Sequence, residues 1–190
     1  MWGAFMFELH RNSQKRIYIK NAVYFITFNT YKKYPYFKEN IFCDLFLDEL
    51  ELCKNMKRFD LYAFNILYNH VHLLIKPGPK YNYSQIIKLI KENTARDINY
   101  IITNRHNAGD TSTCRLRLRE NIKAYRKIFI FKYGNNQCSI PQFKWQKSFH
   151  DYLIRNDRDF QNHYLYTVYN HQKHGLPNNW QYTSLRTNNS

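Results

Sequence analysis

Two histidines separated by a single residue are the side chains in this sequence best placed to hold a metal ion. They lie in residues 69–75, NHVHLLI, where β-branched and aliphatic residues favour a strand. Because side chains two residues apart point to the same face of a strand, His70 and His72 project together while Val71 packs behind them. Two neighbouring imidazoles make half of a divalent-metal site. Such a pair also occurs by chance, so a structural or solvent-facing pair is the alternative.

A helix predicted over residues 156–174 carries groups that could complete such a site. Tyr166 and Asn170 are four residues apart and therefore share one face, with His163 and Lys173 beside them. A phenol has a pKa of about 10 and is a weak nucleophile at neutral pH, but a metal-polarised phosphate and nearby cations would lower the barrier. Packing is the alternative role for any one of the 17 tyrosines.

The elements around these groups predict an α+β fold. The last helix has Asn156 as a suitable N-cap and Gly175 at its end, and its predicted core face comprises Phe160, Tyr164, Thr167, Val168 and His171. Before it we predict strands over 22–29, 61–67 and 70–76, a strand or turn region over 144–154, and helices over 39–54 and from an N-cap at Ser84 to about Ile101. This β-α-β-β-α-(loop)-β-α order is typical of a sandwich with an antiparallel sheet and helices packed on one face.

The chain divides into a basic leader at 1–20, a domain at 21–176 and a polar tail at 177–190. Inside the domain, residues from about 104 to 143 form a basic insertion, which we interpret as an extended loop with at most a short element of its own. This loop is longer than a passive connector should be, so it is either a segment that grips DNA or a mobile one. We expect the tail to be flexible.

The charge of the chain points to a polyanionic partner. There are 29 Lys and Arg against 14 Asp and Glu, a formal net charge of +15, and nucleic acid is the commonest partner for such an excess. A basic protein without such a ligand is the alternative. Aromatic residues make up 18% of the chain, which suits stacking on unpaired bases. The four cysteines lack metal-binding spacing, and no apolar stretch could span a bilayer, so we expect a reduced, cytoplasmic protein without a membrane partner.

Taken together, the segments resemble a known family, the HUH single-tyrosine transposases, and within it the REP-associated tyrosine transposases. The resemblance covers residues 20 to 185, outside the insertion, and rests on the order of AVYFITFN, NHVHLLI, SQIIKLIKENTARDIN, KWQKSFHDYLIRNDRDF and YTVYNHQKHGLP. It implies a ferredoxin-like or RRM-like fold. It also implies that His70 and His72 bind a divalent ion, Mg or Mn, with Asn170 as third ligand, and that Tyr166 attacks DNA.

One departure from the family pattern concerns the third ligand. The family often has Asn-Pro-Val-Lys-His-Gly after the tyrosine, whereas this chain has Asn170 followed by His171, Gln172, Lys173, His174 and Gly175. The missing proline leaves the helix free to continue to Gly175. It also makes His171 and His174 alternatives to Asn170 as a metal ligand.

The resemblance implies cleavage and rejoining of single-stranded DNA next to a hairpin, through a 5′-phosphotyrosine, by a monomer or a homodimer. For contacts with the DNA we predict Lys91, Arg96, Trp145, Lys147, Arg155 and Lys173. A replication-initiator or relaxase-type nickase would use the same chemistry. A non-catalytic DNA- or RNA-binding module with an RRM-like fold, or an inactive transposase descendant, would bind without cutting.

Overall fold

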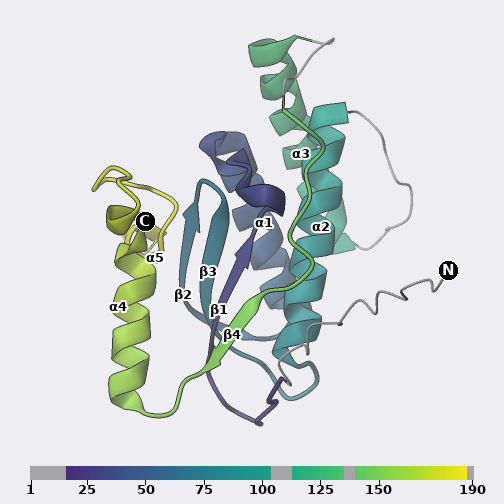
Figure 1. The fold of residues 1–190 in the computed structure, drawn as a ribbon. Helices are drawn as coiled ribbons and strands as arrows, with labels where there is room; N and C mark the ends of the chain where they lie inside the picture. The colour runs from purple at the N-terminus through teal and green to yellow at the C-terminus, as the bar shows by residue number, and fades with distance from the viewer. Residues whose placement is uncertain (1–15, 104–112, 135–139, 188–190) are drawn as a thin grey trace, which may run out of the picture.

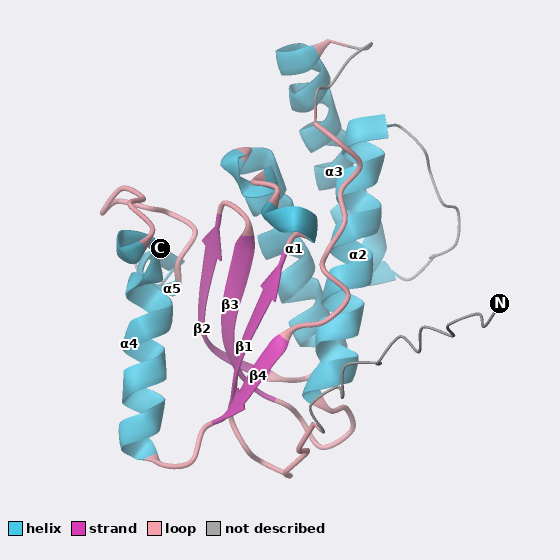
Figure 2. Ribbon diagram, viewed as in Figure 1, coloured by secondary structure: helices cyan, strands magenta, loops and turns pink. Residues whose placement is uncertain are grey.

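Four antiparallel strands form a single sheet in the order β2-β3-β1-β4. The computed structural model describes residues 16–103, 113–134 and 140–187. The strands are β1 Tyr24–Asn29, β2 Asp60–Leu67, β3 His70–Lys76 and β4 His150–Leu153, and Figure 2 shows them side by side between the helices. This arrangement confirms the predicted α+β fold, and the strand predicted over 70–76 has the bounds of β3.

One face of the sheet carries the main hydrophobic core. Alternate side chains of β1, such as Ile26 and Phe28, and of β3, such as Leu73, pack against α1 (Asn40–Lys57) and α2 (Tyr83–Thr103). The helix α3 (Thr113–Tyr133) lies against α1 and α2 (Figure 1). Because side chains alternate along a strand, the residues between these core positions, including both histidines of β3, point to the opposite face.

The opposite face is covered by α4 (Asp157–Lys173), which packs on β2 and β3 (Figure 1). A smaller core there joins Ala63, Leu74 and Val168, with Phe25 packed against it. The expected placement of the helices on one face therefore holds for α1, α2 and α3 but not for α4. The physical reason is that the face opposite the main core also carries apolar side chains, among them Phe25, Ala63 and Leu74, which need cover.

Two local predictions are wrong. The insertion is not an extended loop, because α3 occupies most of it. Leu118, Ile122 and Phe129 are spaced four and seven residues apart and are buried along one side of that helix. Ser84 does not cap α2 either. Asn82 and Gln85 do so reciprocally, since Asn82 Oδ1 accepts from the Gln85 N–H at 2.9 Å and Gln85 Oε1 accepts from the Asn82 N–H at 3.0 Å.

The C-terminal segment is ordered against the outer edge of β2, so the expectation of a flexible tail is wrong from Trp180 onward to α5 (Ser184–Thr187). The Ile66 N–H donates to the Tyr182 carbonyl at 2.9 Å, and Trp180 Nε1 donates to the Ile66 carbonyl at 2.8 Å. Tyr182 is only 2% exposed. An exposed strand edge gains from such cover, and the buried aromatic ring stabilises it.

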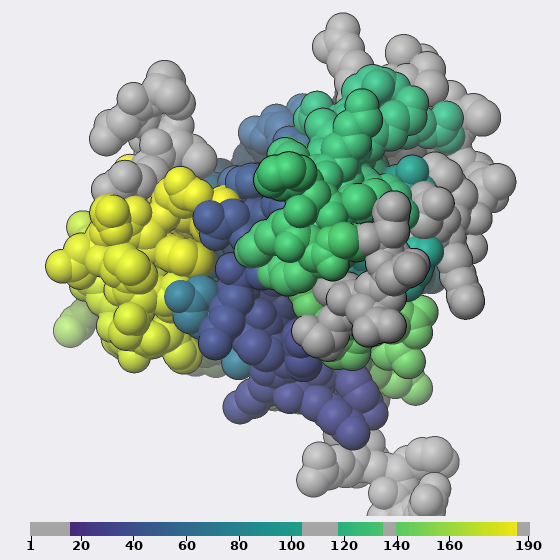
Figure 3. Space-filling view, turned by 90° about the horizontal axis from the view of Figure 1, so that it is seen from above, coloured from purple at the N-terminus to yellow at the C-terminus, as the bar shows by residue number. Residues whose placement is uncertain are grey.

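Figure 3 shows the C-terminal segment in yellow and α3 in green on opposite sides of the molecule, with the purple and blue first part of the chain between them. Of the predicted leader, residues 1–15 lie outside the described residues, and Arg16 contacts Ser84 of α2. In the described part of the chain, no helix is both long and apolar enough to cross a membrane.

Candidate active site

The histidine pair lies in the middle of the sheet, on the face that α4 covers. His70 and His72 have ring centroids 4.9 Å apart and are 9% and 4% exposed. Asn69 Oδ1 lies 2.7 Å from His70 Nδ1, and Thr27 Oγ1 lies 2.7 Å from His72 Nδ1. These contacts hold both rings through Nδ1, so Nε2 is the atom of each ring that could bind a ligand.

Both imidazoles are held in the neutral form. Burial lowers the pKa of His70 to about 4, with His174 and Lys33 adding to the fall. Burial also lowers the pKa of His72 to about 3, helped by His70, while the neighbouring Asn170 side chain partly opposes the fall. A neutral imidazole keeps the lone pair that a metal ion requires, so both side chains are competent ligands at physiological pH.

Asn170 brings an unsatisfied polar group against this pair from α4. It is 0% exposed, and neither Asn170 Oδ1 nor Nδ2 has a hydrogen-bond partner among the residues that the structure describes; the same is true of His72 Nε2. Buried polar atoms are normally satisfied, so three orphaned atoms beside the histidines fit a site for a divalent ion. No group of three or more His, Cys, Asp or Glu side chains within the described ranges is placed to hold a metal. A site built on the histidine pair would therefore need other ligands, such as an amide oxygen and water.

Tyr166 stands beside the pair with its ring partly open to solvent. It is 39% exposed, and its ring centroid lies 5.5 Å from that of His72 and 5.7 Å from that of Phe25. Lys173 Nζ lies 4.5 Å from the Tyr166 ring centroid. The structure therefore brings the predicted tyrosine, the histidine pair and a lysine together, with the phenol able to meet a substrate.

The two rival histidines lie at different places. His171 is 1% exposed, and its Nδ1 lies 3.3 Å from Asn65 Nδ2 in β2, so it packs in the interface between α4 and β2. His174 is exposed, with its ring centroid 4.8 Å from that of His70. Thr167 and Val168 are buried as predicted for the core face, but Asn170 is buried as well. Asn170 as the third ligand remains a prediction.

The six residues predicted to contact DNA do not form one surface. Lys91, Trp145 and Lys147 line a single pocket beside α2. Arg155 lies over the Tyr152 ring, 5.7 Å from its centroid, at the start of α4, and Lys173 lies at its end. Arg96 of α2 forms ion pairs with Asp97 of the same helix, at 2.8 Å, and with Glu49 of α1, at 3.9 Å.

Several residues that support the site were not identified from the sequence. Thr27 and Asn69 fix the histidine rings, and Phe25 packs against both His72 and Tyr166, with ring centroids 5.3 and 5.7 Å away. Asn69 could have been found because it precedes His70 directly. Thr27 and Phe25 could not, because only the pairing of β1 with β3, which sets Thr27 opposite His72, makes them neighbours of the site.

The fold and this arrangement define a ferredoxin-like domain in which a helix tyrosine faces a candidate metal pair on the sheet. The chain belongs to the family of IS200-like transposases, since the model of that family matches residues 18–113. A curated relative from Haemophilus influenzae, assigned as a REP-associated tyrosine transposase, is 30% identical over 131 residues, which are 67% of this chain and 59% of the relative. The chain thus matches about three fifths (59%) of that relative's length.

The overall fold also has a counterpart among solved structures. A REP-associated tyrosine transposase bound to a REP hairpin superposes with a TM-score of 0.62, covering 93% of this chain and 84% of that one at 18% identity. At this identity the likeness shows a shared fold.

Proposed function

We propose that this protein is a transposase that cleaves and rejoins single-stranded DNA through Tyr166. The observation that supports this most directly is the partly exposed phenol beside a buried, neutral histidine pair and an orphaned buried amide. Bound by His70, His72 and Asn170, a divalent ion such as Mg²⁺ or Mn²⁺ would polarise the scissile phosphate as a Lewis acid.

In the proposed reaction, Tyr166 Oη forms a bond to the phosphorus while the bond from phosphorus to the 3′-oxygen breaks. The phenolic proton leaves to solvent, and the departing 3′-oxygen gains one, so the products are a 5′-phosphotyrosine and a free 3′-hydroxyl. Attack by a second 3′-hydroxyl reverses these steps and joins a new strand without external energy. Lys173, whose Nζ lies 4.5 Å from the centre of the Tyr166 ring, places a positive charge where the scissile phosphate would approach, and Phe25 packs against the ring.

The proposed substrate is a single strand next to a hairpin. The net charge of +15 suits a nucleic acid, and a protein of the same fold was solved with a REP hairpin bound.

A covalent-capture experiment tests this function. End-labelled single strands from the DNA that flanks the gene would be incubated with the protein and Mn²⁺ or Mg²⁺, and denaturing gels would report an adduct. We expect a metal-dependent adduct that EDTA and Tyr166→Phe abolish. The matched control is Tyr169→Phe, because Tyr169 is 44% exposed on the same helix. An adduct that survives in Tyr166→Phe would exclude this mechanism, and binding without any adduct would favour a non-catalytic DNA-binding protein.

A further inference from the structure

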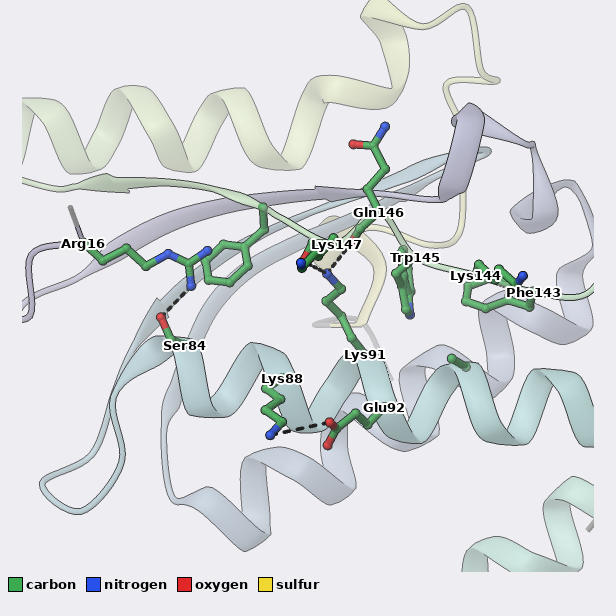
Figure 4. A pocket seen from close by; sticks show the side chains of 12 residues that line it. Arg16, Ser84, Lys88, Lys91, Glu92, Phe143, Lys144, Trp145, Gln146 and Lys147 are labelled. Atoms are coloured by element: carbon green, nitrogen blue, oxygen red, sulfur yellow. Dashed lines mark hydrogen bonds and ion pairs between the residues drawn. The ribbon is translucent and has the colours of Figure 1, made fainter. Parts of the chain in front are cut away.

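A pocket of about 650 Å³ lies between α2 and the segment 143–149, which leads into β4. Figure 4 shows side chains from α2 on one side and from this segment on the other. The core residues of α2 pack on the sheet face opposite α4, so the pocket is separate from Tyr166 and the histidine pair. Its volume is in the range of small-molecule sites, roughly 300–1,000 Å³.

The rim of this pocket is strongly cationic. It carries Arg16 and four lysines against one lining carboxylate, Glu92, which lies 3.8 Å from Lys88 Nζ, while Arg16 Nε also lies 3.7 Å from Asp151 Oδ1 beside the pocket. Lys144 and Lys147 are exposed and have no ion pair among the described residues. Cations gathered around one pocket favour a phosphate-bearing ligand.

The walls offer flat surfaces for a base. The guanidinium of Arg16 lies 3.6 Å from the ring centroid of Phe149, which makes a stacked pair at one end of the pocket. Trp145 lies on the other side, where its ring is packed among phenylalanines that include the buried Phe143 and is only partly open. Unpaired bases stack on aromatic rings and on arginine planes, whereas a paired base has no free face.

The pocket is held in shape by hydrogen bonds that tie the segment 143–149 to α2 and to β1. Lys91 Nζ donates to the carbonyls of Gln146 at 2.6 Å and Lys147 at 3.2 Å, and Arg16 donates to Ser84 Oγ at 2.9 Å. The Gln146 N–H donates to the Asn29 carbonyl at 2.8 Å. Lys91 therefore acts as a brace for the segment, and a ligand would meet a preformed site.

We propose that this pocket holds an unpaired nucleotide of the DNA strand that is cut at Tyr166. This rests on the proposed function. β4 is the outer strand of the sheet beside the pocket, and Tyr152 of β4 stacks on His163 of α4 at a centroid distance of 4.6 Å, on the face of the active site. A strand that occupies both sites would cross the edge of the sheet at β4. The pocket would then set which nucleotides, at a fixed distance from the cut, must be unpaired.

The experiment measures binding without cleavage, in the Tyr166→Phe protein. The probes are a fluorescein-labelled oligothymidine of about ten nucleotides, long enough to track a groove, and the same length as a duplex. Ala95→Phe fills the pocket from α2 without changing charge, and Ala95→Leu is a milder form if the larger ring disturbs folding. Lys144→Ser with Lys147→Ser removes two rim charges. Lys123→Ser with Lys127→Ser removes the same charge from the exposed side of α3 and is the matched control.

We expect Ala95→Phe to weaken oligothymidine binding by about fivefold or more, the loss typical of one stacked base, with little change for the duplex. The Lys144 and Lys147 double variant should weaken it by about tenfold and lower the salt slope by about 1.4, the value for two phosphate contacts on a single strand. The Lys123 and Lys127 double variant should lose less than about threefold in oligothymidine affinity and keep the salt slope of the parent.

Three outcomes would overturn the proposal: no binding of oligothymidine by the parent, unchanged binding in both Ala95 variants, or equal losses in the two lysine pairs. The proposed function is judged separately, by the adduct in protein that retains Tyr166. An adduct together with unaffected binding in the pocket variants would leave the function standing and exclude the pocket. Oligothymidine binding that the pocket variants weaken, without an adduct in protein that retains Tyr166, would support the pocket and exclude the proposed function.

Discussion

Glu49 provides a direct test of the electrostatics inside the domain. It is 0% exposed on α1, and Arg96 Nη2 of α2 lies 3.9 Å from its Oε1. Arg96 also forms two hydrogen bonds with Asp97, at 2.8 and 3.0 Å. Burial raises the pKa of Glu49 well above its ordinary range, the hydrogen-bonded Asp97 raises it further, and Arg96 opposes the rise. We therefore expect Glu49 to be protonated in the folded protein at neutral pH.

The sign of the pH effect follows from this shift. Above the ordinary pKa of a glutamate, about 4.3, the unfolded chain releases a proton that the folded protein retains, so the stability that Glu49 contributes falls as pH rises toward the folded pKa. Each pH unit in this window costs up to about 1.4 kcal/mol, which gives a ceiling of about 4 kcal/mol between pH 5 and pH 8. Coupling to Asp97 and Arg96 spreads the titration, so we expect about 1–3 kcal/mol.

Glu49→Gln should remove this loss, because a glutamine amide can still donate to Asp97 but has no proton to release. The assay is urea unfolding of both proteins at pH 5 and pH 8, in which the titrations of groups that do not interact with Glu49 cancel in the difference. Between pH 5 and pH 8, the free energy of unfolding of the variant should rise by about 1–3 kcal/mol relative to that of the parent. Glu51→Gln, at a largely exposed residue of the same helix, should change stability by less than about 0.5 kcal/mol at either pH. If Glu49→Gln changed the free energy of unfolding equally at pH 5 and pH 8, the inference that Glu49 is protonated in the folded protein would be refuted.

Three further predictions concern the site and the edge of the sheet. Mn²⁺ should raise the urea midpoint of the parent, as binding to the folded state requires, and this shift should vanish in His72→Gln. In metal-free protein, the free energy of unfolding should fall by about 2–4 kcal/mol as pH drops from 6.5 to 4, because the unfolded chain protonates His70 and His72 at a higher pH than the folded protein does. The His70→Asn, His72→Asn double variant should lose less stability over the same pH range. Trp180→Ala should cost about 2–3 kcal/mol in chemical unfolding through lost burial and the lost bond to Ile66, whereas Trp180→Phe should recover much of that.

Local periodicity was enough to predict the parts of the site that lie within one element. His70 and His72 share a strand face because of the two-residue repeat, and Tyr166 with Asn170 share a helix side because of the 3.6-residue repeat. The N-cap at Asn156 was also readable, and its side chain accepts from the Asp159 N–H at 2.9 Å. Each of these features depends on residues close together in the chain.

Features that depend on distant partners were not predictable. The full burial of Asn170 follows from the docking of α4 on the face opposite α1 and α2, which no local pattern encodes. In α3, charged residues dilute the apolar stripe of Leu118, Ile122 and Phe129, so the helical period is weak. The ion pair between Arg96 and the buried Glu49 was not predictable either, because a lone arginine on a helix gives no sign of a carboxylate across the interface.

The two outer strands of the sheet differ in a way that limits how copies of the protein could associate. β2 has its outer edge taken by the segment around Thr183, which bridges to Asn65, while no described strand pairs with the outer edge of β4. Sheet growth into a filament needs two free edges on every copy, one to receive a neighbour and one to offer. A molecule with one free edge can pair only once, so strand addition at β4 could join two copies edge to edge and would then stop.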